Sequence, residues 1–548
     1  MNNWKLLIVL ATLSISAVSA AMTSEMKSPE LKVIIDGRYP SEIKLPNIAS
    51  NITIWEVGNS FIQPKVEFEE YNEFKFIKWV QLMLCSGGSE TRDLFQHPLD
   101  RDILNDYDFI PLVKNCEGIL AQGAKPYLKL GAVPLKFTKD PKISDSGHNI
   151  YPPDSYEEYY SYIKALVEKL VDRFGKEEVL SWRFGCFDEY ENGKVFRARN
   201  GDPEDSFIAY CKLYDYTAQA LTDVLGEEVF IGAHSMSVLN GLWDERRFID
   251  HVANGINYAN GKIGTKLSSL SVSFYDNGPG NLSLNTLGNI VKPLQDKARE
   301  CGLDDLVYGV DEGRILAGTN GMQSANLNSR ATGYLWQAAE DARLFSQAIE
   351  LNMDYFSAWN YLTGGNFTGF PTVSYHVAHN FARFDGYNKI DINYPLKKND
   401  NKDIGCIAGV KEDTVRIMIY NFSTDINSRE IENLSLKVLL PFNKRKVKLI
   451  KWLIDDDCNY FDEWIEDRKK YNISSDAFLL SPEDGQVEAR SVLYGTKSRE
   501  LYFNKLRGKY IKCSKLSPIS FKAKTNNGVY SEELELKSNN VLFIQITK

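Results

Sequence analysis

The stretch Val179-Leu-Ser-Trp-Arg-Phe-Gly-Cys-Phe-Asp-Glu-Tyr-Glu191 is an apolar run that ends abruptly in two acids, Asp188 and Glu189. A short, continuous apolar run bounded by polar residues is typical of a buried strand in a parallel sheet. Segments with helical spacing flank it, from Ser155 to Gly175 and from Asp202 to Gly226. We therefore expect a strand between two helices, with carboxylates at the C-terminal end of the strand.

The same alternation of apolar runs and helical stretches extends from Asn51 to about Phe384. The runs that read as strands are Ile52 to Val57, Trp79 to Cys85, Pro126 to Leu130, Leu180 to Phe187, Val229 to Ala233, Leu270 to Tyr275, Leu306 to Val310, and Tyr355 to Trp359. Apolar strands separated by helices indicate a parallel sheet covered on both faces. Such a series over roughly 330 residues predicts a closed (β/α)₈ barrel, the TIM barrel.

Beyond Asn388 the pattern changes to alternating strands and polar turns with no helical repeats between them, which predicts an appended C-terminal β-sandwich. The strands expected there are Thr414 to Asn421, Leu434 to Leu440, Lys446 to Leu453 and Val541 to Ile546. An earlier strand-like run, Leu31 to Ile35, is expected to pair into this sheet. The predicted regions are a signal peptide at 1–20, an N-terminal segment at 21–50 that pairs with the β-domain, a barrel at 51–385 and a β-sandwich at 386–548.

The N-terminus resembles a secretory signal, because Lys5 is followed by the apolar stretch Leu6 to Leu13 and by small residues up to Ala20. The apolar stretch is too short to span a membrane, and no later segment reaches the necessary length of about 18 apolar residues. We expect cleavage after Ala20 and a soluble protein that is secreted or periplasmic.

Composition excludes some classes of partner. The net charge of −9 argues against a nucleic-acid partner, which would require a basic face. The eight cysteines are widely and irregularly spaced, which favours free thiols, although one or two disulfides remain open. The histidines are scattered, and the close pair His376 and His379 is expected on a helix face. We therefore expect neither a metal nor a cofactor, and the sequence does not determine the oligomeric state.

A second apolar run, Leu306 to Arg314, also carries a carboxylate near its end, Glu312. An isolated pair of acids after a strand is better explained by helix capping or by contact with water than by catalysis. In a parallel barrel, however, the C-terminal strand ends surround one active site, so Glu189 and Glu312 are expected to face each other there. Two facing carboxylates are the minimal equipment for glycoside hydrolysis, since one protonates the leaving oxygen while the other attacks the anomeric carbon or activates water.

The chain resembles glycoside hydrolase family 39, the β-xylosidase and α-L-iduronidase group of a retaining clan. The residues that carry the resemblance are Trp182, Phe184, Asp188-Glu189, Tyr210, Leu213-Tyr214, Ala218, Ala220 and Ile231-Gly232, then Tyr127 to Gly131 with Pro134, Tyr355 to Trp359, Ile454 to Asp456, Asn459-Tyr460 and Trp464. These segments extend from Tyr127 to Trp464, so the resemblance covers most of the chain. In this clan the acid/base follows the fourth barrel strand and the nucleophile follows the seventh.

The resemblance implies a role for particular residues. Glu189 corresponds to the general acid/base and Glu312 to the nucleophile. Tyr275 resembles a tyrosine that hydrogen-bonds near the nucleophile. Trp359 resembles a tryptophan that supports the sugar ring, although a core aromatic is the alternative for it. Asp188 belongs to the substrate-binding set, at a position where the family carries Asn.

Several positions depart from the family pattern. An ionised Asp188 can only accept hydrogen bonds, whereas Asn also donates them. Tyr190 stands in place of a proline, Ser273 stands where a histidine is common, and Leu84 to Gly88 lacks the family's Arg and His. The leading hypothesis is a secreted, retaining, exo-acting glycoside hydrolase whose substrate is an oligosaccharide or a polysaccharide-derived glycan. The alternative is a non-catalytic glycan-binding protein on a degenerate barrel.

Overall fold

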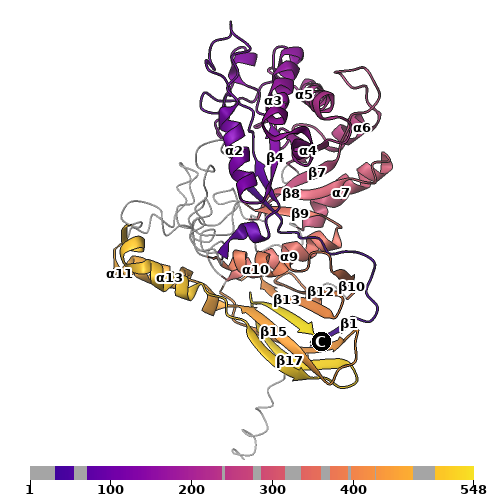
Figure 1. Cartoon of the computed structure of the whole chain (residues 1–548), viewed down its shortest axis with the longest axis vertical. Coiled ribbons are helices and arrows are strands. Elements are labelled where there is room, and N and C mark those ends of the chain that lie inside the picture. The colour runs from indigo at the N-terminus through magenta and orange to yellow at the C-terminus, as the bar shows by residue number, and fades with distance from the viewer. Residues whose placement is uncertain are drawn as a thin grey trace, which may run out of the picture.

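A computed structural model describes residues 31–54, 71–236, 241–275, 286–314, 335–358, 371–392, 396–425, 427–472 and 500–548. Figure 1 shows two parts along the long axis of the molecule, a barrel surrounded by helices and a region of antiparallel sheet that carries the C-terminus. Everything stated about the structure concerns these residues. Of the predicted regions and sites, the signal peptide and Trp359 lie outside them.

The barrel is closed and consists of eight parallel strands, each hydrogen-bonded to the next, with the last paired to the first. The strands are β2 (Asn51–Ile54), β3 (Trp79–Leu82), β4 (Lys125–Leu130), β5 (Arg183–Cys186), β6 (Phe230–Ser235), β7 (Ser269–Tyr275), β8 (Val307–Arg314) and β9 (Tyr355–Ala358). The helices around them are α2 (Ile110–Ala121), α3 (Tyr156–Phe174), α4 (Lys176–Leu180), α5 (Pro203–Leu225), α6 (Arg246–Asn254), α7 (Leu287–Glu300), α9 (Trp336–Glu350) and α10 (Val373–Ala382). The predicted TIM barrel is confirmed.

The strand expected at Leu180 to Phe187 is shorter than predicted. Leu180 ends the helix α4, and β5 begins at Arg183. The acids Glu177 and Glu178 occupy the first turn of α4, where they interact favourably with the positive end of the helix dipole. The apolar run alone could not separate the end of this helix from the start of the strand.

The helices on either side of β5 begin as their sequences indicate. Ser155 caps α3 by accepting a hydrogen bond from the backbone N–H of Glu158 at 3.2 Å. Asp202 caps α5 by accepting from the backbone N–H groups of Glu204 and Asp205. An N-cap of this kind stabilises a helix by about 1 kcal/mol.

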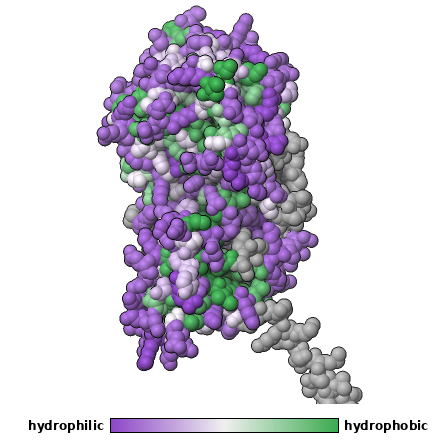
Figure 2. Space-filling view, turned by 90° about the vertical axis from the view of Figure 1, so that its right-hand side faces the viewer, coloured by the Kyte–Doolittle hydropathy of each residue, from purple (hydrophilic) through white to green (hydrophobic). Residues whose placement is uncertain are grey.

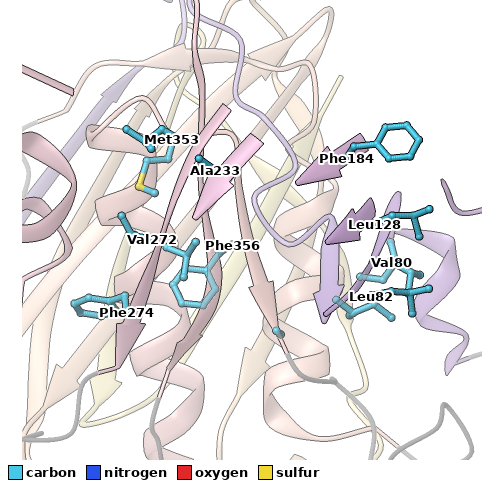
Figure 3. Packing of buried hydrophobic residues seen from close by; sticks show 14 of the residues in the cluster. Val80, Leu82, Leu128, Phe184, Ala233, Val272, Phe274, Met353 and Phe356 are labelled. Atoms are coloured by element: carbon cyan, nitrogen blue, oxygen red, sulfur yellow. The ribbon is translucent and has the colours of Figure 1, made fainter. Parts of the chain in front are cut away.

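The main core fills the space between the barrel strands and their helices. Figure 3 shows Val80, Leu82, Leu128 and Phe184 together on one side of their strands, and all four are fully buried. Successive side chains of a strand point to opposite faces, so the residues between these four face the barrel axis. Polar residues such as Lys129 occupy that inner face, which positions them beneath the C-terminal strand ends.

The β-domain contains two sheets. Its strands are β1 (Leu31–Asp36), β10 (Asn388–Ile390), β11 (Lys397–Lys398), β12 (Lys402–Lys411), β13 (Thr414–Ser423), β14 (Ile431–Leu439), β15 (Lys446–Ile454), β16 (Ile519–Lys524), β17 (Val529–Lys537) and β18 (Val541–Thr547). One sheet has the order β1-β14-β17 and the other the order β10-β12-β13-β18-β15-β16, with β11 paired to β12. The strand β1 runs parallel to β14, so the described N-terminal segment lies beside the β-domain.

Two helices interrupt the β-domain between β15 and β16, namely α11 (Phe461–Lys470) and α13 (Arg507–Cys513). The expectation of strands without intervening helices is therefore wrong for this segment. Trp464, Tyr502 and Tyr510 form the centre of a separate small core that holds the two helices together. Figure 1 shows α11 and α13 at the side of the molecule, away from the two sheets. The two helices are hard to recognise in the sequence because they are short and rich in charged residues.

The barrel and the β-domain share a packed boundary. The indole N–H of Trp336 in α9 donates a hydrogen bond of 2.8 Å to the carbonyl oxygen of Ser423 in β13. The ring of Phe422 packs edge-on against the same indole, with 5.2 Å between the ring centroids. Phe422 and Trp336 belong to one continuous hydrophobic core, so the β-domain is anchored to the barrel.

Figure 2 shows one face of the molecule as largely hydrophilic, with hydrophobic residues in separate groups. No helix among the described residues is long and apolar enough to cross a membrane. All eight cysteines have free thiols, and six of them are buried. The question of one or two disulfides is thereby answered in favour of free thiols.

Candidate active site

The two acids that follow β5 lie on a tight turn. Its backbone has positive φ angles at Phe187 (63°) and at Glu189 (38°), a conformation that L-residues adopt rarely and that recurs at functional sites. The turn is tied to both neighbouring strands, because the N–H of Phe187 bonds the carbonyl of Leu130 and the N–H of Tyr190 bonds that of His234, at 2.8 and 2.9 Å. The surrounding strands therefore fix the direction in which Glu189 points.

An irregularity in β8 positions the second pair of acids. Val310 pairs with Val272 of β7, but the next pair in the register is Glu312 with Ser273, so Asp311 is an extra residue in the ladder. Such a bulge bends a strand and redirects its side chains. As a result, the consecutive residues Asp311 and Glu312 both contact side chains of the barrel interior, where regular alternation would direct only one of them.

Asp311 is the centre of a fully buried polar cluster. Its carboxylate forms an ion pair with Lys129, and both side chains are 0% exposed. The hydroxyls of Ser271 and Tyr355 donate hydrogen bonds to it at 2.5 and 2.6 Å. Burial opposes the ionisation of Asp311, but the Lys129 ammonium outweighs burial and holds the pKa of this carboxyl below its ordinary value. The pair is therefore charged at neutral pH.

Glu312 lies above this pair and is 7% exposed. The phenol of Tyr275 donates a hydrogen bond of 2.7 Å to its Oε2. Burial, followed by the negative charges of Asp188 and Glu189, raises the pKa of Glu312 well above its ordinary value. Ser273, whose hydroxyl donates to Glu189, is also the register partner of Glu312, so the carboxyls after β5 and β8 lie close to each other.

Glu189 is half-buried, and both of its carboxyl oxygens have partners. The hydroxyl of Ser273 donates to Oε1 at 2.7 Å, and the side-chain amide of Asn192 donates to Oε2 at 2.6 Å. Ser273 comes from β7 and Asn192 from the turn after β5. The carboxyl group is therefore oriented by two separate elements while part of it stays open to solvent.

Asp188 is 2% exposed and lies against the imidazole of His234, whose Nδ1 is 2.5 Å from Asp188 Oδ1. The other ring nitrogen of His234, Nε2, lies 2.9 Å from Ser273 Oγ. Burial and the charge of Glu189 raise the pKa of Asp188 well above its ordinary value. Burial and the nearby Lys129 ammonium lower the pKa of His234. Asp188, His234, Ser273 and Glu189 thus form a continuous chain of polar contacts.

The structure brings four of the five predicted site residues together at the C-terminal end of the barrel, namely Asp188, Glu189, Tyr275 and Glu312. The fifth, Trp359, lies outside the described residues. Sequence reasoning did not assign roles to Lys129, Asp311, His234 and Asn192. A charged or ionisable residue inside an otherwise apolar strand was the signal available for Lys129 and His234.

The close histidine pair of α10 has structural partners. His376 contacts the carbonyl oxygen of Ser514 through Nε2 at 2.7 Å, and His379 stacks on Phe76 with 5.9 Å between the rings. Within the described ranges, no group of three His, Cys, Asp or Glu side chains is arranged to hold a metal ion. The pair therefore lies on a helix face, as its spacing indicates.

A closed parallel barrel with two glutamates facing each other beyond its C-terminal strand ends has the fold and the acidic groups of a glycoside hydrolase. Comparison with known proteins supports this class. The family model for glycosyl hydrolases family 39 matches residues 93–259. A beta-xylosidase of Caldicellulosiruptor saccharolyticus is 23% identical over 385 residues, which are 67% of this chain and 74% of that protein.

Solved structures show the same fold. The family 39 enzyme of Xanthomonas axonopodis pv. citri superposes with a TM-score of 0.66 at 13% identity, covering 96% of this chain and 99% of that one. A monomeric beta-xylosidase of Caulobacter crescentus gives 0.65 at 15% identity, covering 94% and 99%. Residues 93–259 are thus similar to glycosyl hydrolases family 39, as the motifs of the chain indicate, and this similarity supports a retaining hydrolase of O-glycosyl bonds.

Proposed function

We propose that this protein is an exo-acting glycosidase that works by double displacement, with Glu312 as the nucleophile and Glu189 as the general acid/base. In the first step a Glu312 oxygen attacks the anomeric carbon while Glu189 gives its proton to the departing glycosidic oxygen. In the second step Glu189 removes a proton from water, which attacks the same carbon and releases Glu312 as a carboxylate. Two inversions leave the anomeric configuration unchanged.

The observation that carries this assignment is the different environment of the two glutamates. Glu312 is almost completely buried and is held by Tyr275, as suits a nucleophile in a fixed position. Glu189 is partly open to solvent, as suits a group that must exchange protons with a leaving group and with water. The phenol of Tyr275 also stabilises the charged form of Glu312 that the attack requires.

The substrate class and the location are part of the proposal. The relatives named beta-xylosidase favour release of single pentose units from a β-linked glycan as the first activity to test. The residues Lys5, Leu6 to Leu13 and Ala20 favour export with cleavage of a signal peptide. Sequencing the N-terminus of the exported protein tests this point, and an intact Met1 on it would contradict cleavage.

The mechanism is tested with a panel of aryl pentosides, hexosides and uronides, which first identifies the sugar that is cleaved. On that sugar, Glu312→Ala and Glu189→Ala should each lose about three orders of magnitude or more in kcat/KM. Azide should restore turnover to Glu189→Ala on a substrate with a good leaving group, because azide can attack the glycosyl-enzyme without a general base. Glu177→Ala is the control, since Glu177 is exposed on α4 near the opposite end of β5.

Full activity in both glutamate variants would show the assignment to be wrong. Glycan binding without hydrolysis of any substrate would favour the non-catalytic alternative. NMR of the first-formed product gives an independent result, because double displacement requires the product to keep the anomeric configuration of the substrate.

A further inference from the structure

We propose that Asp311 is a positioning residue for the nucleophile, because its contacts with other barrel strands hold the bulge in β8 that turns Glu312 into the site. The inference deepens the proposed function and rests on it, since it takes Glu312 as the attacking group. Asp311 directly precedes Glu312 and is 0% exposed, so it is out of reach of a substrate. It acts on the reaction through the direction of its neighbour.

The bulge decides which way Glu312 points. Val310 and Val272 are register partners, and both are buried in the core between the strands and their helices. Side chains alternate in a regular strand, so Asp311 would point into the barrel and Glu312 would point outward, to the same side as Val310. The extra residue instead pairs Glu312 with Ser273, whose hydroxyl faces the site. Without the bulge, Glu312 would therefore point away from the site.

The carboxylate of Asp311 is held by side chains from three other strands. Lys129 of β4 forms an ion pair with it, Ser271 of β7 donates a hydrogen bond to Oδ2 at 2.5 Å, and Tyr355 of β9 donates to Oδ1 at 2.6 Å. Because the Lys129 ammonium balances the carboxylate, the cluster adds no net negative charge beneath Glu312. Asp311 is therefore fixed without opposing the ionisation of the nucleophile.

The backbone of Asp311 is held as well. An extra residue in a ladder lacks regular backbone partners, and a buried carbonyl oxygen needs one. The hydroxyl of Thr53 in β2 donates a hydrogen bond of 2.9 Å to this oxygen, and the side-chain amide of Gln81 in β3 makes a longer contact of 3.4 Å with it. Contacts from β2, β3, β4, β7 and β9 thus converge on one residue of β8.

Gly309 makes room for one of these contacts. It is the register partner of Tyr355, and a Cβ added to it would collide with the ring of Tyr355. The ring therefore lies against the backbone of β8, from where its hydroxyl reaches Asp311. Only glycine permits so close an approach, so the sequence of β8 is adapted to this contact.

The first test weakens the hold on Asp311 without leaving a charge unpaired. Tyr355→Phe and Ser271→Ala each remove one donor to the carboxylate and keep the Lys129 pair. The readout is inactivation by a 2-deoxy-2-fluoro glycoside of the cleaved sugar, whose limiting rate constant reports attack on the bound sugar. This rate constant should fall about tenfold in each variant, with the half-saturating concentration within about twofold. A small displacement of an attacking group slows the reaction without weakening binding.

Ser269→Ala is the matched control. Ser269 also lies on β7, on the same face as Ser271, and its buried hydroxyl has no hydrogen-bond partner among the described residues. This variant should keep the wild-type rate constant. A purely structural role of the contacts would lower the urea midpoints of Tyr355→Phe and Ser271→Ala but leave the limiting rate constant of the folded enzyme unchanged. That result would overturn the proposal.

The second test is structural and needs no turnover. A crystal structure of Lys129→Met/Asp311→Ala, which buries no unpaired charge, should show Glu312 turned away from Tyr275 and their 2.7 Å hydrogen bond broken. Glu312 still bonded to Tyr275 in that variant would overturn the proposal, and the first test does not depend on this variant folding. A displaced Glu312, combined with a wild-type enzyme that carries the fluoro-sugar on another residue, would instead contradict the proposed function alone.

Discussion

The ion pair between Lys129 and Asp311 gives the sharpest prediction about stability. Replacing Lys129 by Met keeps most of the side-chain volume but leaves the Asp311 carboxylate without its cation. Both groups are completely buried, and loss of one partner of a buried pair typically costs about 3–5 kcal/mol. Hydrogen bonds from Ser271 and Tyr355 remain and continue to stabilise the carboxylate. We therefore expect the lower end of this range, about 3 kcal/mol.

The assay is urea unfolding of wild type, Lys129→Met, Asp311→Asn and the double variant at neutral pH. The double variant places no uncompensated charge in the barrel, so it should be more stable than Lys129→Met by about 2 kcal/mol. A loss below about 1 kcal/mol in Lys129→Met, or a double variant no more stable than it, would refute this account of the pair.

The pH dependence has a definite sign. Folding lowers the pKa of Asp311, so its ionised form stabilises the folded state above the ordinary carboxyl range, and this stabilisation is lost as pH falls through the folded value. In Lys129→Met the cation is absent, so the lowering is expected to vanish. The difference in stability between wild type and Lys129→Met should therefore shrink as the solution is acidified.

Two substitutions test the hydrogen bonds to the catalytic glutamates. Ser273→Ala removes the hydroxyl that orients Glu189, so kcat/KM should fall by about tenfold, while Ser269→Ala on the same strand should leave it unchanged. Tyr275→Phe removes the donor to Glu312, which should lower kcat/KM by roughly tenfold to a hundredfold and move the acidic limb to higher pH. An unchanged kcat/KM in Ser273→Ala, or an unshifted acidic limb in Tyr275→Phe, would contradict the hydrogen bond assigned to that residue.

Much of the barrel could be predicted because its outer strand residues follow a simple physical rule. Val80, Leu128 and Phe184 lie in continuous apolar runs since they are buried against helices, and each run marks a strand. The start of β5 was misplaced because Leu180 is equally apolar in the last turn of a helix. The helices α11 and α13 were missed because their small aromatic core joins residues far apart in sequence, such as Trp464 and Tyr510.

The candidate site could be located from the sequence, but its connections could not. A carboxylate after an apolar run suffices to place Glu189 and Glu312 at the same end of a parallel barrel. The bulge that also directs Asp311 into the interior is a property of the pairing between two strands and leaves no local signal. The contact between Asp188 and His234 likewise depends on two neighbouring strand ends, so only the structure shows it.

The most direct test of the central claim is to trap the glycosyl-enzyme. A 2-deoxy-2-fluoro glycoside of the cleaved sugar, with a good leaving group, should inactivate the enzyme. The fluorine slows both formation and hydrolysis of the glycosyl-enzyme, whereas the good leaving group speeds only its formation, so the intermediate accumulates. Mass spectrometry of the digested protein should then find one sugar on the peptide that contains Glu312. A label on Glu189, or inactivation in a Glu312→Ala variant at the wild-type rate, would contradict the assignment of the nucleophile.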